Sequence, residues 1–293
     1  MALKSVFNTM KQEGYLIKPI DQYLLSLNAR DNDRASNVNS PSQAGVCQRA
    51  NYYARMGYQQ DGSIEPRTRR IFNNGDGVHD RLQGYLEQAG VCLMREVPVL
   101  CDPYTIQGHT DGLVRISKEE IGILEIKSIN SNGFTNLKEP KPEHKLQAMV
   151  YLYCCEERRK YLRSTYKTEE EFKASKIFRI QYYTKHYQHF KDGSKYTRKE
   201  KIRMQVKLGL QADELLWNTP RPITKVVFLY ENKDNQDLKE YTVTRDNEVL
   251  DYILNRYSEL NEAIANEQIP EREGTSKSCP TCRWCGYKIE CGW

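Results

Sequence analysis

Two short stretches of this 293-residue chain, Gly108-His-Thr-Asp-Gly112 and Leu124-Glu-Ile-Lys-Ser128, decide its fold. Each places charged side chains inside a run of residues that otherwise has the pattern of a buried β-strand. Burying an unpaired carboxylate costs on the order of several kcal/mol, so Asp111 and Glu125 each require a cation or another partner. Glu125 and Lys127 are two residues apart, which places both side chains on one face of a strand. The two stretches therefore predict a charged site built on neighbouring strands.

The flanking sequence predicts the elements that complete this site. We expect a helix over 78–89 with His79 in its first turn, after the Gly75-Asp76-Gly77 stretch. A loop over 130–142 then leads to a helix over 143–155, on which Gln147 and Tyr151 are four residues apart and share a face. Strands are expected over 91–101, 104–116 and 121–128, a hairpin over 223–230 and 239–244, and a further helix over 246–266.

The charged residues suit metal-dependent cleavage of a phosphodiester bond. Asp111 and Glu125 can hold one or two Mg²⁺ or Mn²⁺ ions through oxygen ligands. His79 adds a nitrogen ligand, which favours Mn²⁺. Lys127 would orient the attacking water and stabilise charge in the transition state. Gln147 and Tyr151, on one helix face, are expected to position the substrate or the water.

Each of these residues also has an ordinary structural interpretation. An aspartate before glycine is more often a turn residue than a ligand, and Glu125 with Lys127 matches a solvated pair on an edge strand. A histidine at a helix start is more often a surface residue, and a glutamine and a tyrosine four apart are common on helices. The order and spacing of the whole set, rather than any single member, favour the catalytic interpretation.

The set resembles the motif series of RecB-like nucleases in the PD-(D/E)XK superfamily. The resemblance rests on Gly75-x-x-x-His79, Gly108-His-Thr-Asp111, Glu125-Ile-Lys127 and Gln147-x-x-x-Tyr151, and it covers about 45–155 and 223–293. It implies an α/β fold of the restriction-endonuclease type, a mixed central sheet flanked by helices. It also implies metal-dependent DNA cleavage, with the backbone carbonyl of Ile126 as a further metal ligand.

Nine cysteines are present, and a cluster lies near the C-terminus. Taken by its spacing alone, Cys279-x-x-Cys282-x-x-Cys285-x5-Cys291 has the four thiols that a tetrahedral Zn²⁺ site needs. Cys92, Cys101, Cys154 and Cys155 lie in apolar runs, and we expect them to be small buried side chains. Without a secretory signal pattern or a membrane-spanning run, a cytoplasmic protein with reduced thiols is expected, and no membrane partner.

An upstream cysteine changes the preferred interpretation of this cluster. Cys47-Gln-Arg49 together with the C-terminal cysteines resembles the iron–sulfur subgroup of RecB-like nucleases, which includes AddB and the CRISPR-associated exonucleases. That resemblance implies a [4Fe-4S] cluster held by Cys47, Cys282, Cys285 and Cys291. Cys279 departs from the subgroup pattern and keeps the Zn²⁺ alternative open.

The formal net charge of +5 is too small by itself to indicate a nucleic-acid partner, but its distribution is uneven. Residues 157–203 contain fifteen lysines and arginines against six acidic residues, with tyrosines and phenylalanines among them. A charge run is usually a solvated helix face, yet beside a nuclease core it also suits single-stranded DNA. The expected contacts are Arg198, Lys199, Lys201 and Arg203, with Lys233 at a hairpin tip as a weaker candidate.

These observations give a domain plan and two competing functions. The plan has an N-terminal helical extension (1–45), a nuclease core (46–156), a basic helical insertion (157–220), and the rest of the core with the cysteine motif (221–293). The favoured function is a DNA exonuclease acting on single-stranded ends in recombination, repair or phage DNA metabolism. The alternative is a DNA-end-binding subunit of a larger recombination or CRISPR spacer-acquisition complex. No helicase motif is present, so a helicase, recombinase or CRISPR integrase would be a separate chain.

Overall fold

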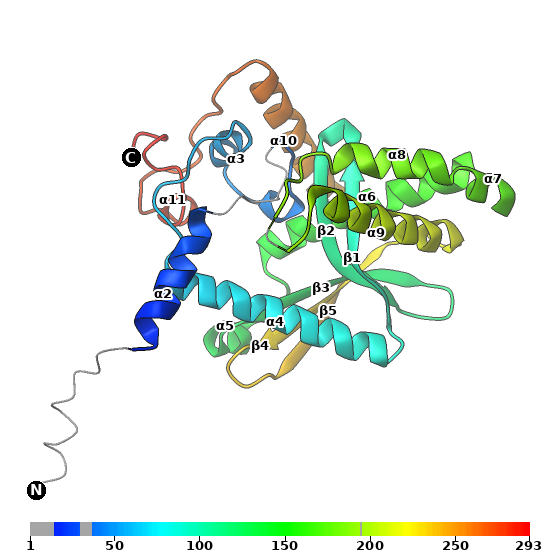
Figure 1. Cartoon of the computed structure of the whole chain (residues 1–293), viewed down its shortest axis with the longest axis horizontal. Coiled ribbons are helices and arrows are strands. Elements are labelled where there is room, and N and C mark those ends of the chain that lie inside the picture. Colours follow the sequence, from blue (N-terminus) through cyan, green and yellow to red (C-terminus); the bar gives the residue numbers. More distant parts are fainter. Residues whose placement is uncertain (1–14, 30–36, 194) are drawn as a thin grey trace, which may run out of the picture.

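The computed structural model describes residues 15–29, 37–193 and 195–293. Its five strands form one mixed sheet, in which they lie side by side in the same order as in the chain. The strands of this sheet are β1 (Cys92–Cys101), β2 (Ile106–Arg115), β3 (Ile121–Ile129), β4 (Lys225–Asn232) and β5 (Leu238–Thr244). Neighbouring strands are antiparallel except β3 and β4, which are parallel. A parallel pair needs a long crossover connection, and here that connection carries the helical insertion (Figure 1).

Helix α4 (Pro66–Gln88) covers one face of the sheet. Its Val78 and Leu82 pack against Val114, Leu124 and Ile126, which project from β2 and β3. Pro66 is the first residue of this helix. An amide hydrogen at that position would have no acceptor within the helix, so proline is well tolerated there. Burial of Val78 and Leu82 holds α4 across β2 and β3.

Helix α6 (Pro142–Thr165) covers the other face. Its residues 148–152 are buried, and Ala148 and Leu152 pack in one apolar cluster with Ile123 of β3 and Phe228 of β4. Helix α10 (Asn247–Ala265) packs beside α6 and extends this layer. The sheet therefore lies between two helical layers.

The crossover adds several helices to the core. They are α5 (Ser131–Asn136), α7 (Glu169–Ala174), α8 (Lys176–His186) and α9 (Arg198–Asn218). Helix α9 packs against β1, α6 and α8, so the insertion is docked on the sheet. Its buried anchor is Asp213, which accepts hydrogen bonds from the Arg158 guanidinium at 2.7 and 2.8 Å and from the Tyr183 hydroxyl at 2.8 Å.

The C-terminal segment returns to an early part of the chain. Helix α3 (Gln48–Arg55) lies beside it, and the Tyr53 hydroxyl donates a hydrogen bond to the Glu290 carbonyl at 2.9 Å. The remaining described helices are α2 (Ile17–Ser26), α11 (Pro280–Arg283) and the 3₁₀ turns Leu27–Ala29, Pro41–Gln43 and Asp102–Tyr104. Among the described residues, no helix has the length and apolar character needed to cross a membrane.

Most expected elements are confirmed, including the β-strands, the hairpin and the helical character of the insertion. The predicted boundaries of two helices were wrong. Helix α4 begins at Pro66, so His79 lies in its interior and not in a first turn. Helix α6 continues to Thr165, so the start of the expected insertion is the end of a core helix. The expected loop at 130–142 contains the short α5, and residues 1–14 and 30–36 of the expected N-terminal extension lie outside the described residues.

Candidate active site

Strands β2 and β3 separate at the two residues that the sequence singled out. Their ladder runs from Arg115 paired with Ile121 to Gly112 paired with Leu124 and ends there. Beyond that point the Asp111 carboxylate replaces the ladder, because its Oδ2 accepts a hydrogen bond from the Ile126 amide at 2.6 Å. Asp111 and Glu125 are neighbours at this gap, where the charge of Asp111 acts on the Glu125 carboxyl.

His79 reaches the gap from α4. Its Nδ1 lies 3.2 Å from Oδ1 of Asp111. Burial by itself lowers the pKa of the imidazole, but the hydrogen bond and charge of Asp111 outweigh it and raise the pKa above its usual value. Both oxygens of Asp111 are therefore engaged, one by the backbone of β3 and one by His79.

Glu125 is almost completely buried, with 1% of its surface exposed. Its Oε1 lies 2.6 Å from Lys127 Nζ, whereas its Oε2 has no hydrogen-bond partner among the described residues. Burial raises the pKa of this carboxyl from its usual 4.5 to about 8, the charge of Asp111 adds to the rise, and Lys127 opposes it. A buried carboxylate oxygen without a partner beside a second carboxylate is the arrangement that a divalent cation stabilises.

A hydrogen-bonded chain leads from this carboxylate to α6. Lys127 Nζ donates to Oε1 of Gln147 at 3.1 Å, and Gln147 Nε2 donates to the Tyr151 hydroxyl at 2.7 Å. Burial raises the pKa of Tyr151 well above its usual value, so the phenol keeps its proton. The chain holds the Lys127 ammonium over the gap from the face of the sheet opposite α4.

The structure therefore brings His79, Asp111, Glu125, Lys127, Gln147 and Tyr151 together. Their chemical roles remain predictions, as does the role of the Ile126 carbonyl. Within residues 15–29, 37–193 and 195–293, no group of three or more His, Cys, Asp or Glu side chains is arranged to hold a metal ion. Three of the four carboxylate oxygens of Asp111 and Glu125 contact His79, the Ile126 amide or Lys127, whereas Oε2 of Glu125 contacts no described polar group.

Two residues near the site were missed by the sequence analysis. Gln83 is 2% exposed, and its Nε2 donates to the Asp111 carbonyl at 2.8 Å and to Oε1 of Glu96 at 3.1 Å. Glu96 has a φ of 49°, a left-handed conformation that is rare for a non-glycine residue within a strand. Gln83 follows His79 by four residues on one helix face, and this spacing was the available signal.

A basic groove lies near the other end of α4. Arg67, Arg70, Asn74 and Lys233 line a cavity of about 330 Å³ together with Ile71 and the acidic Asp234. Arg67, Arg70 and Asn74 lie on the same face of α4 as Val78, because successive members are three or four residues apart. Farther along the helix this face packs on the sheet. Arg70 is paired with Asp21 of α2. This face of α4 is thus apolar where it covers the sheet and polar where it faces the turn after β4.

The four residues of α9 proposed for DNA contact differ in their surroundings. Arg198 donates to the Gln188 carbonyl at 2.8 Å, and Lys201 Nζ donates to the Lys191 carbonyl at 2.9 Å. These two side chains therefore hold the connection between α8 and α9. Lys199 and Arg203 are exposed.

The cysteines expected to bind a cluster come together from distant parts of the chain. Cys47, Cys282, Cys285 and Cys291 line one small enclosed pocket next to α3. Cys279 does not line this pocket, although its thiol interacts with that of Cys282. All four remaining cysteines, Cys92, Cys101, Cys154 and Cys155, are buried, as expected.

Comparison with known proteins gives one sequence match and several structural similarities. A family model described as the PD-(D/E)XK nuclease superfamily matches residues 67–292. No curated protein matches the chain.

Solved structures resemble the chain at low identity. They include an alkaline exonuclease, LHK-Exo, from Laribacter hongkongensis (11% identity, 84% of this chain and 93% of that chain covered, TM-score 0.44). SSO0001 is similar at 15% identity, with 93% and 94% covered and a TM-score of 0.45. LHK-Exo in complex with dAMP is similar at 14% identity, with 80% and 90% covered and a TM-score of 0.43.

Proposed function

Because the chain belongs to the PD-(D/E)XK nuclease superfamily, we propose that it is a metal-dependent DNA exonuclease that hydrolyses phosphodiester bonds at single-stranded ends. Nucleases of this superfamily generally use Mg²⁺ or Mn²⁺. The observation that carries the proposal is the buried Glu125 carboxylate, whose Oε2 has no partner among the described residues and which lies beside Lys127 and the Asp111–His79 pair.

His79, Asp111 and Glu125 would hold the cation, with the Ile126 carbonyl as a further ligand. A bound Mg²⁺ or Mn²⁺ supplies Lewis-acid stabilisation of the phosphoryl oxygens and lowers the pKa of water. The donor set fits such an ion, because carboxylate and carbonyl oxygens suit Mg²⁺ and an added imidazole nitrogen favours Mn²⁺.

Lys127 orients the attacking water and stabilises the negative charge that develops on the phosphoryl group. Its ammonium is held from two sides, by Glu125 at 2.6 Å and by Gln147 at 3.1 Å. Tyr151 fixes Gln147, so its effect on the reaction passes through the position of Lys127. Such fixed donors accelerate a reaction because they need no reorganisation when charge develops.

The substrate strand approaches the site along the basic groove of Arg67, Arg70, Asn74 and Lys233. Phosphate contacts made by lysine and arginine give affinity without sequence preference, as a DNA-degrading enzyme requires. Lys233 lies directly after β4, and its backbone amide donates to the Ile129 carbonyl at 2.9 Å, which holds the turn against the end of β3.

The test is digestion of end-labelled single-stranded DNA by the full chain. We expect hydrolysis with Mg²⁺ or Mn²⁺ and none with EDTA. Lys127→Ala should retain DNA binding and lose cleavage, whereas Lys145→Ala, a lysine of α6 paired with Glu139 at the surface, should cut normally. Cleavage by Lys127→Ala at the rate of the unaltered protein would show that the assignment is wrong. DNA binding by the unaltered protein without any cleavage would favour the end-binding subunit.

The four cysteines of the pocket beside α3 would hold a [4Fe-4S] cluster. Four thiolates are the usual ligand set for this cluster, and residues from both ends of the chain line the same pocket. Such a cluster would link α3 to the C-terminal segment and stabilise the contact between them.

Iron and acid-labile sulfide in anaerobically purified protein test this assignment. We expect four irons per chain in the unaltered protein and in Cys279→Ser, but loss of iron in Cys282→Ser. Stoichiometric Zn²⁺ that is lost in Cys279→Ser would instead support the zinc alternative.

A further inference from the structure

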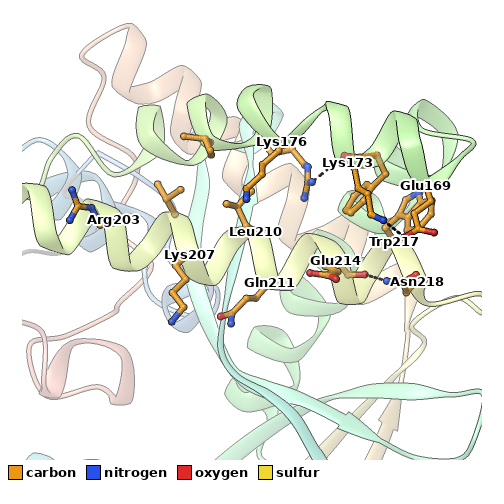
Figure 2. Close-up of a pocket in the computed structure, with 14 residues that line it drawn as sticks. Glu169, Lys173, Lys176, Arg203, Lys207, Leu210, Gln211, Glu214, Trp217 and Asn218 are labelled. Carbon is orange, nitrogen blue, oxygen red and sulfur yellow. Dashed lines mark hydrogen bonds and ion pairs between the residues drawn. The ribbon is translucent and has the colours of Figure 1, made fainter.

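A second groove lies on the helical insertion, between α9 on one side and α7 with α8 on the other (Figure 2). Its volume is about 530 Å³. Helices α8 and α9 pack directly against each other, so the groove follows the surface of their contact.

The groove carries cations that the protein itself does not neutralise. Of its basic residues, Lys173 is paired with Glu169 at 2.5 Å, and Arg179 is buried against the Phe172 ring and its carbonyl. The other three, Lys176, Arg203 and Lys207, are exposed and have no hydrogen-bond or ion-pair partner in the part of the chain that the structure describes.

Two of these cations, Arg203 and Lys207, lie toward one end of the groove, and Lys176 lies near its middle. Figure 2 shows Arg203 and Lys207 on α9 with Lys176 on α8, whereas the acidic Glu169 and Glu214 lie toward the other end. Positive charges on two helices that flank the same groove match the repeated negative charges of a phosphodiester backbone.

Between the cations the groove is apolar. Ile180 of α8 and Val206 and Leu210 of α9 line it and are half-buried, so they leave apolar surface in contact with solvent. Unpaired bases have apolar faces that can cover such surface while their phosphates reach the cations. A duplex, whose bases are stacked inside, offers no such surface.

The basic end of this groove is also the end nearest the catalytic strand. Gln205 of α9 lies between Arg203 and Lys207 in sequence, and its Oε1 is 2.7 Å from Nε2 of His109. His109 is two residues before Asp111 on β2. Helix α9 therefore has one face against the catalytic strand and the opposite face in the groove.

We propose that this groove binds a single DNA strand, with Lys176, Arg203 and Lys207 contacting phosphates and the apolar floor contacting bases. The inference rests on the proposed function, because it places the part of the substrate that lies beyond the catalytic site. It also replaces Arg198 and Lys201 as DNA contacts, since those two side chains bind backbone carbonyls within the insertion.

The test is fluorescence anisotropy of labelled oligothymidylate in the Lys127→Ala background of the full chain, so that binding does not depend on cleavage. The variant is K176A/R203A/K207A, and the matched control is K118A/K138A/K277A, which removes three charges from exposed positions outside the groove. Oligomers of about 16 and about 4 nucleotides span the range of single-strand site sizes.

We expect the groove variant to bind the longer oligomer at least about tenfold more weakly than the control. The slope of log affinity against log salt should fall by about 2, because each phosphate contact with a single strand contributes about 0.7. The short oligomer should bind both variants equally.

Equal binding of the longer oligomer by the two variants would overturn the proposal. So would displacement of DNA from the unaltered groove by an acidic peptide at equal charge concentration, because it would identify an acidic protein segment as the occupant. If the unaltered protein cuts no DNA, the proposed function fails, while the anisotropy result for the groove still stands.

Discussion

The carboxylate of Asp111 accepts a hydrogen bond from the backbone amide of Ile126 at 2.6 Å, across the gap where β2 and β3 stop pairing. A side chain here takes the place of a main-chain ladder bond. The same residue thus closes the sheet and contributes a carboxylate to the candidate active site, so it links fold stability to chemistry.

The two roles of Asp111 can be separated by substitution. Asp111→Ala leaves the Ile126 amide without its acceptor, so we expect the free energy of unfolding to fall by about 1–3 kcal/mol. Asp111→Asn keeps an acceptor oxygen and should lose less stability. Both should lose cleavage. Chemical denaturation of the two metal-free variants checks this prediction, and equal losses of stability would contradict it.

Glu125 should make the stability of the metal-free protein depend on pH. Its folded-state pKa of about 8 exceeds its usual 4.5, so the fold favours the protonated carboxyl. The stabilisation is complete below about pH 4.5 and is lost as the pH rises through about 8. Thermal unfolding in EDTA should therefore show this decline, and Glu125→Gln should reduce it.

Mn²⁺ provides the complementary measurement for Glu125. A cation favours the ionised carboxylate, so Mn²⁺ should restore stability to the unaltered protein above about pH 8 and have less effect on Glu125→Gln. Identical pH profiles for the two proteins in EDTA would show that Glu125 is not responsible.

Gln83 should act on the site through the position of β2. Gln83→Leu removes the donor to the Asp111 carbonyl and to Glu96, so we expect a loss of about 1–3 kcal/mol in stability together with slower cleavage. Gln88→Leu, at an exposed position near the end of the same helix, is the matched control and should be close to neutral. A neutral Gln83→Leu would exclude this positioning role.

Asp213 should hold the insertion on the core. It is fully buried and accepts hydrogen bonds from Arg158 and Tyr183, so Asp213→Ala leaves the half-buried Arg158 guanidinium without its main partner. We expect a loss of about 3–5 kcal/mol. Glu214→Ala, an exposed neighbour, should change stability by less than about 0.5 kcal/mol. Denaturant titration of both variants distinguishes these outcomes.

The central strands were predictable from sequence because apolar runs interrupted by charge are a local pattern. The start of α4 was missed since Gly75 and Gly77 suggested a boundary. Each glycine costs a helix about 1 kcal/mol relative to alanine, and packing of Val78 and Leu82 on the sheet outweighs that cost. Pro66 was the better start signal.

Residues that act through long-range contacts were less predictable. The convergence of Cys47 with the C-terminal cysteines was expected only from a family resemblance, since nothing in local spacing relates the two ends of the chain. The groove between α9 and the pair α7 and α8 could be identified only from the structure. Charge density indicated the segment, but the pairing of Arg198, Lys201 and Lys173 decides which cations are available to a ligand.

The most direct test of the central claim compares linear and circular single-stranded DNA of the same sequence, incubated with the protein and Mn²⁺. An exonuclease built on Asp111, Glu125 and Lys127 should degrade the linear strand and leave the circle intact, and the Lys127→Ala protein should degrade neither. A linear strand that stays intact under these conditions, or a circle that is cut at the same rate, would contradict the account.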